Sequence, residues 1–230
     1  MTFTIVGRCR TTGHLGICMA TSSPAVGNRC SFVSRDGAVA FQAVAEPRLG
    51  AATLRLLEAR NSPRAAIEQI RTADDWPQTR QIGIVDSDGR SAAFTGEANI
   101  PWAGHRVGPD YVAMGNVLAG AQVAAAIEAA FLVSEGLPIE ERLVRAIEAG
   151  RDAGGQEEGQ VSASLITFGR EPVARCDLRV DLNAEPIAEL RRIYDWYAPL
   201  IPYFVARTAD PNQLRYKDWL AKQGHVREYR

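Results

Sequence analysis

Lysine is almost missing from this chain of 230 residues. Lys217 and Lys222, both close to the C-terminus, are the only two, and every other basic side chain is an arginine. Arginine keeps its proton in proteins, so it cannot replace lysine as a base or as an amine nucleophile. Any mechanism that needs a lysine within the first 216 positions is therefore excluded.

The chain also has no excess of charge of one sign and no long apolar run. Lys plus Arg total 26 against 27 Asp plus Glu, which argues against a nucleic acid or an anionic membrane as partner and favours a small ligand. The longest apolar stretch, 119–133, is interrupted by Gln122 and Glu128, and no basic region followed by an apolar core opens the sequence. We expect a soluble cytoplasmic protein that binds neither nucleic acid nor membrane.

Cysteine and histidine are equally scarce. Three of the four cysteines, whose spacings match no zinc motif, lie in apolar strand-like segments, so we expect reduced core residues. No pair or triplet of His, Asp or Glu has the spacing of metal ligands. We expect no metal and no other cofactor.

The length suits one large domain, or one domain with an appendage. Alternating and helical patterns divide the first 197 residues into three sets of strands, the first two each followed by two helices and the last by one. The predicted strands are 2–9, 15–21, 38–45, a hairpin over 81–96, a short strand within the loop 99–116, 160–168 and 174–180; the predicted helices are 51–60, 63–71, 121–133, 138–150 and 185–197.

This order lacks the strict alternation of a parallel doubly wound fold. It predicts an α+β protein, a four-layer αββα sandwich in which two mainly antiparallel sheets stack and helix pairs cover both outer faces. Helices 51–71 and 121–150 are expected on opposite faces, with residue 2 near the start of a central strand.

Thr2 is the residue with the most chemical promise. It opens the alternating segment 2–9, in which Phe3 and Ile5 fall on one face and Thr2 and Thr4 on the other, the pattern of a half-buried strand. Removal of Met1 would leave an α-amine on the same residue as a hydroxyl. Such an amine titrates near pH 8, so it can act as the base for its own nucleophile. The plainer interpretation is an ordinary strand threonine.

Several segments resemble the bacterial family known as domain of unknown function 1028. The Trp-Ala-Gly-His block at 102–105 and the Gly-Asn-x-Leu-Ala-Gly block at 115–120 are the most specific, and the resemblance covers roughly residues 1–197. The resembling segments are MTFTIVGR (1–8), AVAFQAVAEPRLG (38–50), RQIGIVDSDGRSAAFTG (80–96), PWAGHRVGPDYVAMGNVLAG (101–120), AGG with GQVSASLI (153–155 and 159–166) and CDLRVDLNAEPIAELRRIY (176–194).

The resemblance implies an N-terminal nucleophile hydrolase fold for residues 1–197. It makes the Thr2 hydroxyl the expected nucleophile and its amine the base, and amide hydrolysis through an acyl-enzyme the expected reaction, with a small amide or peptide as substrate. The proteasome-like branch of that superfamily uses a lysine beside its threonine, which this chain cannot supply. The family's name assigns no activity.

Partners for Thr2 are proposed by position. Ser22 and Ser23 follow the second strand, where this superfamily often places a polar side chain that orients the nucleophile; a Ser-Ser-Pro turn is the alternative. Gln42 and Glu46 lie where a strand passes into a helix, a place for an oxyanion donor, although Glu46 also suits a helix N-terminus.

Two more residues complete the candidate set. Asn116, in a glycine-flanked segment read as a loop, is a candidate oxyanion donor or simply a turn residue. His105 is a candidate second acid or base, although a histidine that only pins the 99–116 segment is the simpler explanation.

Two other classes of function stay open. One is a non-catalytic ligand-binding or scaffold member of the same fold, which would need neither Met1 removal nor a lysine. The other is an enzyme that uses His105 with a carboxylate such as Asp110, which is disfavoured because no serine or cysteine lies in a nucleophile-elbow pattern.

The C-terminal arm, 198–230, changes in composition. It holds both lysines, three prolines and five aromatic rings, and is too short and broken to hold a core of its own. We expect it to pack onto a second copy of the chain in a homodimer, because aromatic residues are enriched at interfaces; packing on its own domain is the alternative.

Overall fold

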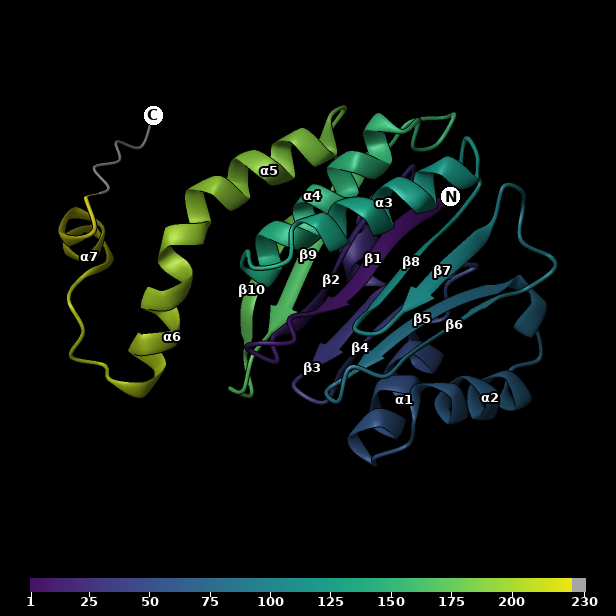
Figure 1. Ribbon diagram of the computed structural model, residues 1–230, viewed down its shortest axis with the longest axis horizontal. Helices are drawn as coiled ribbons and strands as arrows, with labels where there is room; N and C mark the ends of the chain where they lie inside the picture. The colour runs from purple at the N-terminus through teal and green to yellow at the C-terminus, as the bar shows by residue number, and fades with distance from the viewer. Residues whose placement is uncertain (225–230) are drawn as a thin grey trace.

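The computed structural model describes residues 1–224 and has four layers, helices over sheet over sheet over helices (Figure 1). A six-stranded and a four-stranded antiparallel sheet stack face to face. Helices α3 and α4 lie on the outer face of the first sheet, and α1 and α2 on the outer face of the second. The predicted α+β sandwich, with helices 51–71 and 121–150 on opposite faces, is confirmed.

The six-stranded sheet is built around the β1–β2 hairpin. Each strand pairs antiparallel with its neighbours, and β1 lies between β2 and β8. In spatial order the strands are β10 (Ala174–Val180), β9 (Ser162–Phe168), β2 (Leu15–Thr21), β1 (Thr2–Arg8), β8 (Tyr111–Asn116) and β7 (Gly104–Gly108).

The four-stranded sheet is a meander of antiparallel neighbours. The predicted hairpin over 81–96 forms its second half. The strands are β3 (Ser31–Ser34), β4 (Gly37–Ala43), β5 (Arg80–Asp86) and β6 (Ser91–Thr95).

The helices begin where the sequence offers caps. Glu46 accepts from the Arg48 N–H at the start of α1, and Ser62 accepts from the Ala65 N–H at the start of α2. Each of these helices has a proline in its first turn, where the missing N–H costs no hydrogen bond. The long helices are α1 (Pro47–Glu58), α2 (Pro63–Ala73), α3 (Ala121–Val133), α4 (Ile139–Asp152) and α5 (Pro186–Tyr197).

Strand β1 is buried on both faces rather than one. Phe3 and Ile5 pack in the core beneath the helices, as their alternation predicts. Val6, on the opposite face, packs in the core between the two sheets. Thr4 is fully buried on that inner face, because the second sheet covers it. The half-buried pattern was a misreading: the polar face meets another sheet, not water.

Two local predictions need correction. The segment 99–116 holds two strands, since β7 and β8 form a hairpin that turns at Asp110, whose φ is +69°. Asn116 is the last residue of β8 and not a loop residue. Glycines at 104, 108 and 115 hid this strand pair because they lower the apparent strand propensity.

The C-terminal arm leaves the layered body after α5 (Figure 1). It comprises the short turns and helices η3 (Ala198–Leu200), α6 (Ile201–Ala209) and α7 (Tyr216–Lys222). Leu200, Tyr203 and Leu220 are buried together, with Trp196 and Trp219 packed against them. These arm residues therefore pack on one another and on Trp196 of α5. Residues 225–230 lie outside the described residues.

Candidate active site

Polar residues form two facing rows between the sheets. In the six-stranded sheet, Thr2 pairs in register with Thr21 on one side and with Asn116 on the other. In the four-stranded sheet, Gln81 pairs with Gln42 on β4 and with Thr95 on β6. Because both rows point into the space between the sheets, a polar layer lies at the N-terminal end of β1.

The Thr2 hydroxyl lies within this layer. Its Oγ1 is 3.1 Å from Oγ1 of Thr21, and the Thr21 hydroxyl also donates to the backbone carbonyl of Met1. The Gln42 amide donates to the Thr2 carbonyl at 3.4 Å. Thr2 is only 4% exposed. The hydroxyl, its neighbour and the peptide bond that joins Met1 to Thr2 therefore lie together.

Gln81 joins the two sheets. Its Oε1 accepts from the side-chain amides of Gln42 (2.8 Å) and Asn116 (2.9 Å). Its own amide donates to the carbonyl of Gly115 at 2.8 Å and to Oγ1 of Thr95 at 3.0 Å. Gln42 in turn accepts from Thr4 at 2.6 Å. Each of these buried amides thus has its partners inside the protein, as buried polar groups require.

His105 lies at the edge of this network. Its Nδ1 is 2.9 Å from Oγ1 of Thr95, which itself accepts from Gln81. Partial desolvation of the ring lowers the pKa of the His105 imidazole, which favours its neutral form. The structure thus links His105 to the Thr2 layer through Thr95 and Gln81.

Ser23 and Glu46 bond to groups outside the Thr2 layer, and no hydrogen bond joins Ser22 to it within residues 1–224. Ser22 and Ser23 are half-buried in the bend after β2, and Oγ of Ser23 accepts from Arg29 at 2.6 Å. Glu46 caps α1 and pairs with Arg48, whose hydrogen bonds lower the pKa of its carboxyl to about 2. Gln42 and Asn116 are the proposed partners that the fold brings to Thr2.

The backbone is strained beside two of these residues. Ala43 follows Gln42 with φ at +71°, and Val117 follows Asn116 with φ at +53°. A positive φ costs a residue with a Cβ of order 1 kcal/mol or more, and such residues cluster at functional sites. The strain lies at the ends of β4 and β8, two of the three strands that carry the amide network.

Sequence reasoning missed Thr21 and Gln81. Thr21 was discoverable, since a symmetric hairpin that joins 8 to 15 also joins Thr2 to Thr21. Gln81 gave no signal, because a polar residue at the start of a strand is usually solvated. Gln81 can join the two sheets only because the six-stranded sheet lies opposite it, and the sequence does not show this.

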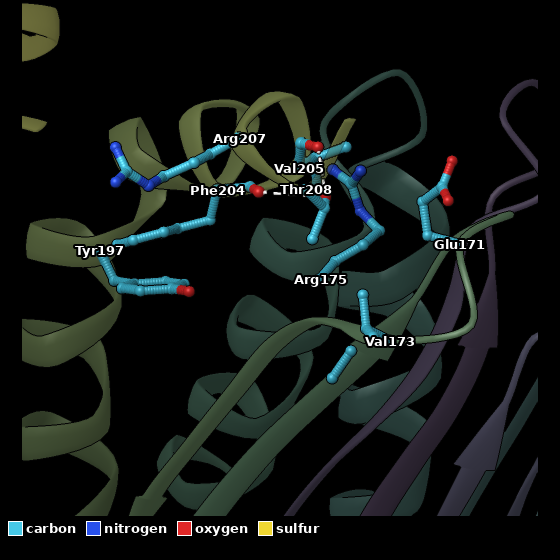
Figure 2. Close-up of a pocket in the computed structure, with 9 residues that line it drawn as sticks. Glu171, Val173, Arg175, Tyr197, Phe204, Val205, Arg207 and Thr208 are labelled. Atoms are coloured by element: carbon cyan, nitrogen blue, oxygen red, sulfur yellow. Dashed lines mark hydrogen bonds between the residues drawn. The ribbon is translucent and has the colours of Figure 1, made fainter. Parts of the chain in front are cut away.

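Four cavities in the described part of the chain lie away from the Thr2 layer, and none of its residues lines them. One, of about 270 Å³, lies between α6 and the start of β10. Figure 2 shows Phe204 and Arg207 of the arm on one side of it and Val173 and Arg175 on the other. This groove separates the arm from the body rather than serving Thr2.

The family model that matches residues 2–190 is a family of unknown function (DUF1028). The chain belongs to this family. A solved structure of protein SPO2555 from Silicibacter pomeroyi, of the same family, is 29% identical with a TM-score of 0.79, covering 85% of this chain and 88% of that one. Among curated proteins no sequence matches this chain.

A second similar structure is the Anbu (Gly-1) mutant from Hyphomicrobium sp. strain MC1. It is 10% identical with a TM-score of 0.43, and the match covers 90% of this chain and 99% of that one. A likeness at this level carries no argument about activity. The family match establishes membership, and the chemistry has to be argued from the residues.

Within residues 1–224 no three His, Cys, Asp or Glu side chains are grouped to hold a metal ion. Over the same range no helix has the length and apolar character needed to cross a membrane.

Proposed function

We propose that this protein is an amidohydrolase of the N-terminal nucleophile type, in which Thr2 becomes the first residue once Met1 is removed. The Thr2 hydroxyl is the nucleophile, its own α-amine is the base, and a small amide or peptide-like molecule is the substrate. The observation that carries the proposal is the pair of hydroxyls, Thr2 and Thr21, held together against the Met1 carbonyl.

The reaction follows from these groups. The Thr2 amine takes the proton of Oγ1 as Oγ1 attacks the carbonyl carbon of the substrate. The C–N bond then breaks, and the leaving amine takes the proton from the Thr2 ammonium. Water hydrolyses the resulting ester by the same base and restores the free hydroxyl.

Thr21 supports this role as a positioning residue. With Met1 present, its hydroxyl donates to the Met1 carbonyl. Loss of Met1 removes that acceptor and leaves the Thr21 hydroxyl between Oγ1 and the new amine, where it would orient both. We expect removal of Met1 to uncover Thr2, which is 4% exposed with Met1 present, and so to open the site to a substrate.

The electrostatics suit an amine base. Burial lowers the pKa of the Met1 amine, which indicates that this end of the sheet disfavours a positive charge. The Thr2 amine would lie one residue deeper. A lowered pKa keeps more of the amine unprotonated at neutral pH, which a base requires, and no lysine in the first 216 positions is there to replace it.

The test begins with the mass of the untagged protein after expression with methionine aminopeptidase. Processed protein is then offered fluorogenic small amides and a β-lactone electrophile. We expect loss of Met1, hydrolysis of at least one amide, and one lactone adduct on Thr2 by peptide mapping. Thr2→Ser should retain the adduct and Thr2→Ala should lose it.

Two controls separate chemistry from folding. Insertion of one lysine after Met1 prevents excision and leaves Thr2 within the chain, so activity and adduct should both disappear. Thr12→Ala changes an exposed turn threonine and should leave both intact. Processed, folded protein that gives neither hydrolysis nor an adduct would contradict the proposal.

The complete bonding of the amide network favours one rival function, a non-catalytic ligand-binding or scaffold protein. Gln42, Gln81 and Asn116 bond to one another, as a purely structural layer would. That rival predicts a retained Met1, or processed protein whose Thr2→Ala variant binds every ligand unchanged.

We also propose a two-fold homodimer in the cytoplasm, with the C-terminal arm as its contact. The exposed ring of Phe204 on α6 supports this, while the arm's buried cluster shows that several of its rings already have partners within the chain. Light scattering on the full chain and on a chain lacking 205–230 tests it. A monomeric full-length chain rules out the dimer, and an unchanged dimer after deletion rules out the arm.

A further inference from the structure

A second cluster of reactive groups lies at the opposite end of the β1–β2 hairpin from Thr2. A cavity of about 380 Å³, here called the Cys9 cavity, is bounded by the β1–β2 turn, the turn between α3 and α4, the start of α4 and Arg175 of β10. Cys9 lines it and is half-exposed, unlike the other three cysteines, which are buried.

Arg142 lines the same cavity and lacks an anionic partner. It is only 5% exposed, and its guanidinium lies over the Phe131 ring, 4.0 Å from the centroid. One terminal nitrogen donates to the Phe131 carbonyl, but Nε has no hydrogen-bond partner. Within residues 1–224 no carboxylate forms an ion pair with it, although buried charges are normally paired. The site therefore holds an uncompensated buried cation.

Cys9 and Glu135 line the same cavity, and both can supply a negative charge that acts on Arg142. Burial by itself would raise the pKa of the thiol, but hydrogen bonds from the Thr12 hydroxyl and from the backbone of Thr12 and Thr11, with the Arg142 charge, outweigh it and lower the pKa. A thiolate at Cys9 would compensate Arg142 within the cavity.

Other charged groups around the cavity are already paired or are not cationic. Arg175 bonds to Glu140, and Arg10 bonds to Asp110. Burial lowers the pKa of His14, so it is neutral at pH 7. The titratable and charged groups that face Cys9 and Arg142 are Arg10 and His14 from the hairpin turn, Glu135 from the α3–α4 turn, Glu140 from α4, Asp110 from the β7–β8 turn and Arg175 from β10.

A basic groove adjoins the Cys9 cavity and shares Arg10, Thr11 and Thr12 with it. Four further arginines line this groove, and with Arg10 they outnumber the two carboxylates that pair with them, Asp36 and Asp110. The groove therefore carries net positive charge and suits the carboxylates of a ligand that reaches into the cavity. The four arginines are Arg8, Arg35, Arg60 and Arg170.

We propose that Cys9 is a thiol–disulfide exchange site for a small anionic disulfide. The Cys9 thiolate attacks one sulfur, a new S–S bond forms between Cys9 and that half, the original S–S bond breaks, and the other half leaves as a thiolate that takes a proton from water. Arg142 holds the Cys9 thiolate, and the arginine groove holds the carboxylates. The site is remote from Thr2 and does not depend on the proposed hydrolase activity.

Glutathione disulfide is the test compound. The reduced, folded protein is incubated with it, and modified peptides are mapped by mass. We expect one adduct, on Cys9. Cys18, Cys30 and Cys176 serve as internal controls, because burial raises the pKa of each and they should react only after unfolding in urea.

Charge selectivity is measured with two more disulfides, neutral bis(hydroxyethyl) disulfide and cationic cystamine. We expect Cys9 to react fastest with the anionic compound, by about tenfold over the cationic one at low salt, and the difference to shrink as salt is added. Equal rates for the three compounds would overturn the assignment of an anionic ligand.

Variants test the thiolate. Rates of alkylation by iodoacetamide are measured from about pH 6 to about pH 9, around the ordinary thiol pKa of about 8.5. Arg142→Met and Thr12→Val should each move the midpoint upward and slow the reaction at neutral pH, while Arg142→Lys restores part of it. Thr11→Val is the matched control, since Thr11 contributes only its backbone.

A Cys9 that titrates like a cysteine in the unfolded chain would overturn the proposal. So would an unchanged midpoint in both Arg142→Met and Thr12→Val. Circular dichroism on each variant excludes unfolding as the cause of a change, and Thr12→Val, an exposed turn substitution, keeps the test decisive if Arg142→Met folds poorly.

Discussion

At the Thr2 end of the β1–β2 hairpin the buried polar side chains are neutral and bond to one another, whereas at the Cys9 end they are charged and one cation has no carboxylate. Gln81 bonds at both ends of its amide group, but Nε of Arg142 has no partner. The same two strands thus adjoin amides that bond to one another at one end and an uncompensated charge at the other. An exception at the Thr2 end is Gln156, which donates to the Asn116 carbonyl while its own Oε1 has no partner. The difference teaches that buried polar side chains stabilise the fold only where each of them has its hydrogen-bond or ion-pair partners.

The largest effect on stability is expected from a substitution of Gln81, which lies at the centre of the amide network. Gln81→Leu leaves the amides of Gln42 and Asn116 without their acceptor, and the carbonyl of Gly115 without its side-chain donor. We expect the free energy of unfolding to fall by about 3 kcal/mol. Urea denaturation at neutral pH measures it.

Gln69→Leu is the matched control for that substitution, because Gln69 is an exposed glutamine that bonds only to Asn61. We expect a change of at most about 0.5 kcal/mol. Equal losses in the two variants would mean that the amide network contributes no more to the free energy of unfolding than an exposed glutamine does.

A smaller effect is expected at the hydroxyl pair. Thr21→Val keeps the shape of the side chain and removes the hydroxyl that bonds to Thr2 and to the Met1 carbonyl. We expect a loss of about 1 kcal/mol in unprocessed protein, measured by urea denaturation. Thr12→Val, an exposed threonine at the other end, should show almost none.

Removal of the unpaired cation should cost less still. Arg142→Met keeps much of the packing on Phe131 and removes a buried charge with no ion pair, so we expect a change in the free energy of unfolding below about 1 kcal/mol. Arg80→Met is the contrast, because it strands the buried carboxylate of Asp74, 2.7 Å away, and should cost about 3 kcal/mol. Similar losses in the two variants would refute the distinction between paired and unpaired arginines.

The smallest expected effect concerns pH. Burial lowers the pKa of His14 at the Cys9 end and of His105 at the Thr2 end. The unfolded chain, with a histidine pKa of about 6.5, therefore binds more protons than the folded chain just below that pH. The contribution of the two neutral histidines to the free energy of unfolding is fully present at neutral pH, and it decreases as the pH falls below about 6.5.

Urea midpoints at two pH values, one on each side of that range, check this dependence. His14→Gln and His105→Gln should each flatten it, and the two effects should add, because the residues lie at opposite ends of the hairpin. A double variant as pH-sensitive as the parent would assign the dependence to other groups.

Much of the architecture was predictable, because its signals are local. The caps and first-turn prolines of α1 and α2 and the hairpin of β5 and β6 all follow from neighbours along the chain. The β7–β8 hairpin was not, since glycines weakened its pattern. Of the residues proposed beside Thr2, the fold brings Gln42 and Asn116 to it, while the side chains of Ser23 and Glu46 bond elsewhere. Thr21 and Gln81 were missed because cross-strand and cross-sheet contacts leave no periodic signal.

The sequence by itself determined the layer order, the absence of a lysine base and the position of Thr2 at the start of a strand, since composition and periodicity act within one element. Only the tertiary structure decided that the threonine face of β1 meets a second sheet, that Gln81 reaches across to Asn116, and that Cys9 shares a cavity with Arg142. These depend on how sheets and helices pack, because the free energy of burial is set by whatever surface covers a side chain and not by its neighbours in the chain.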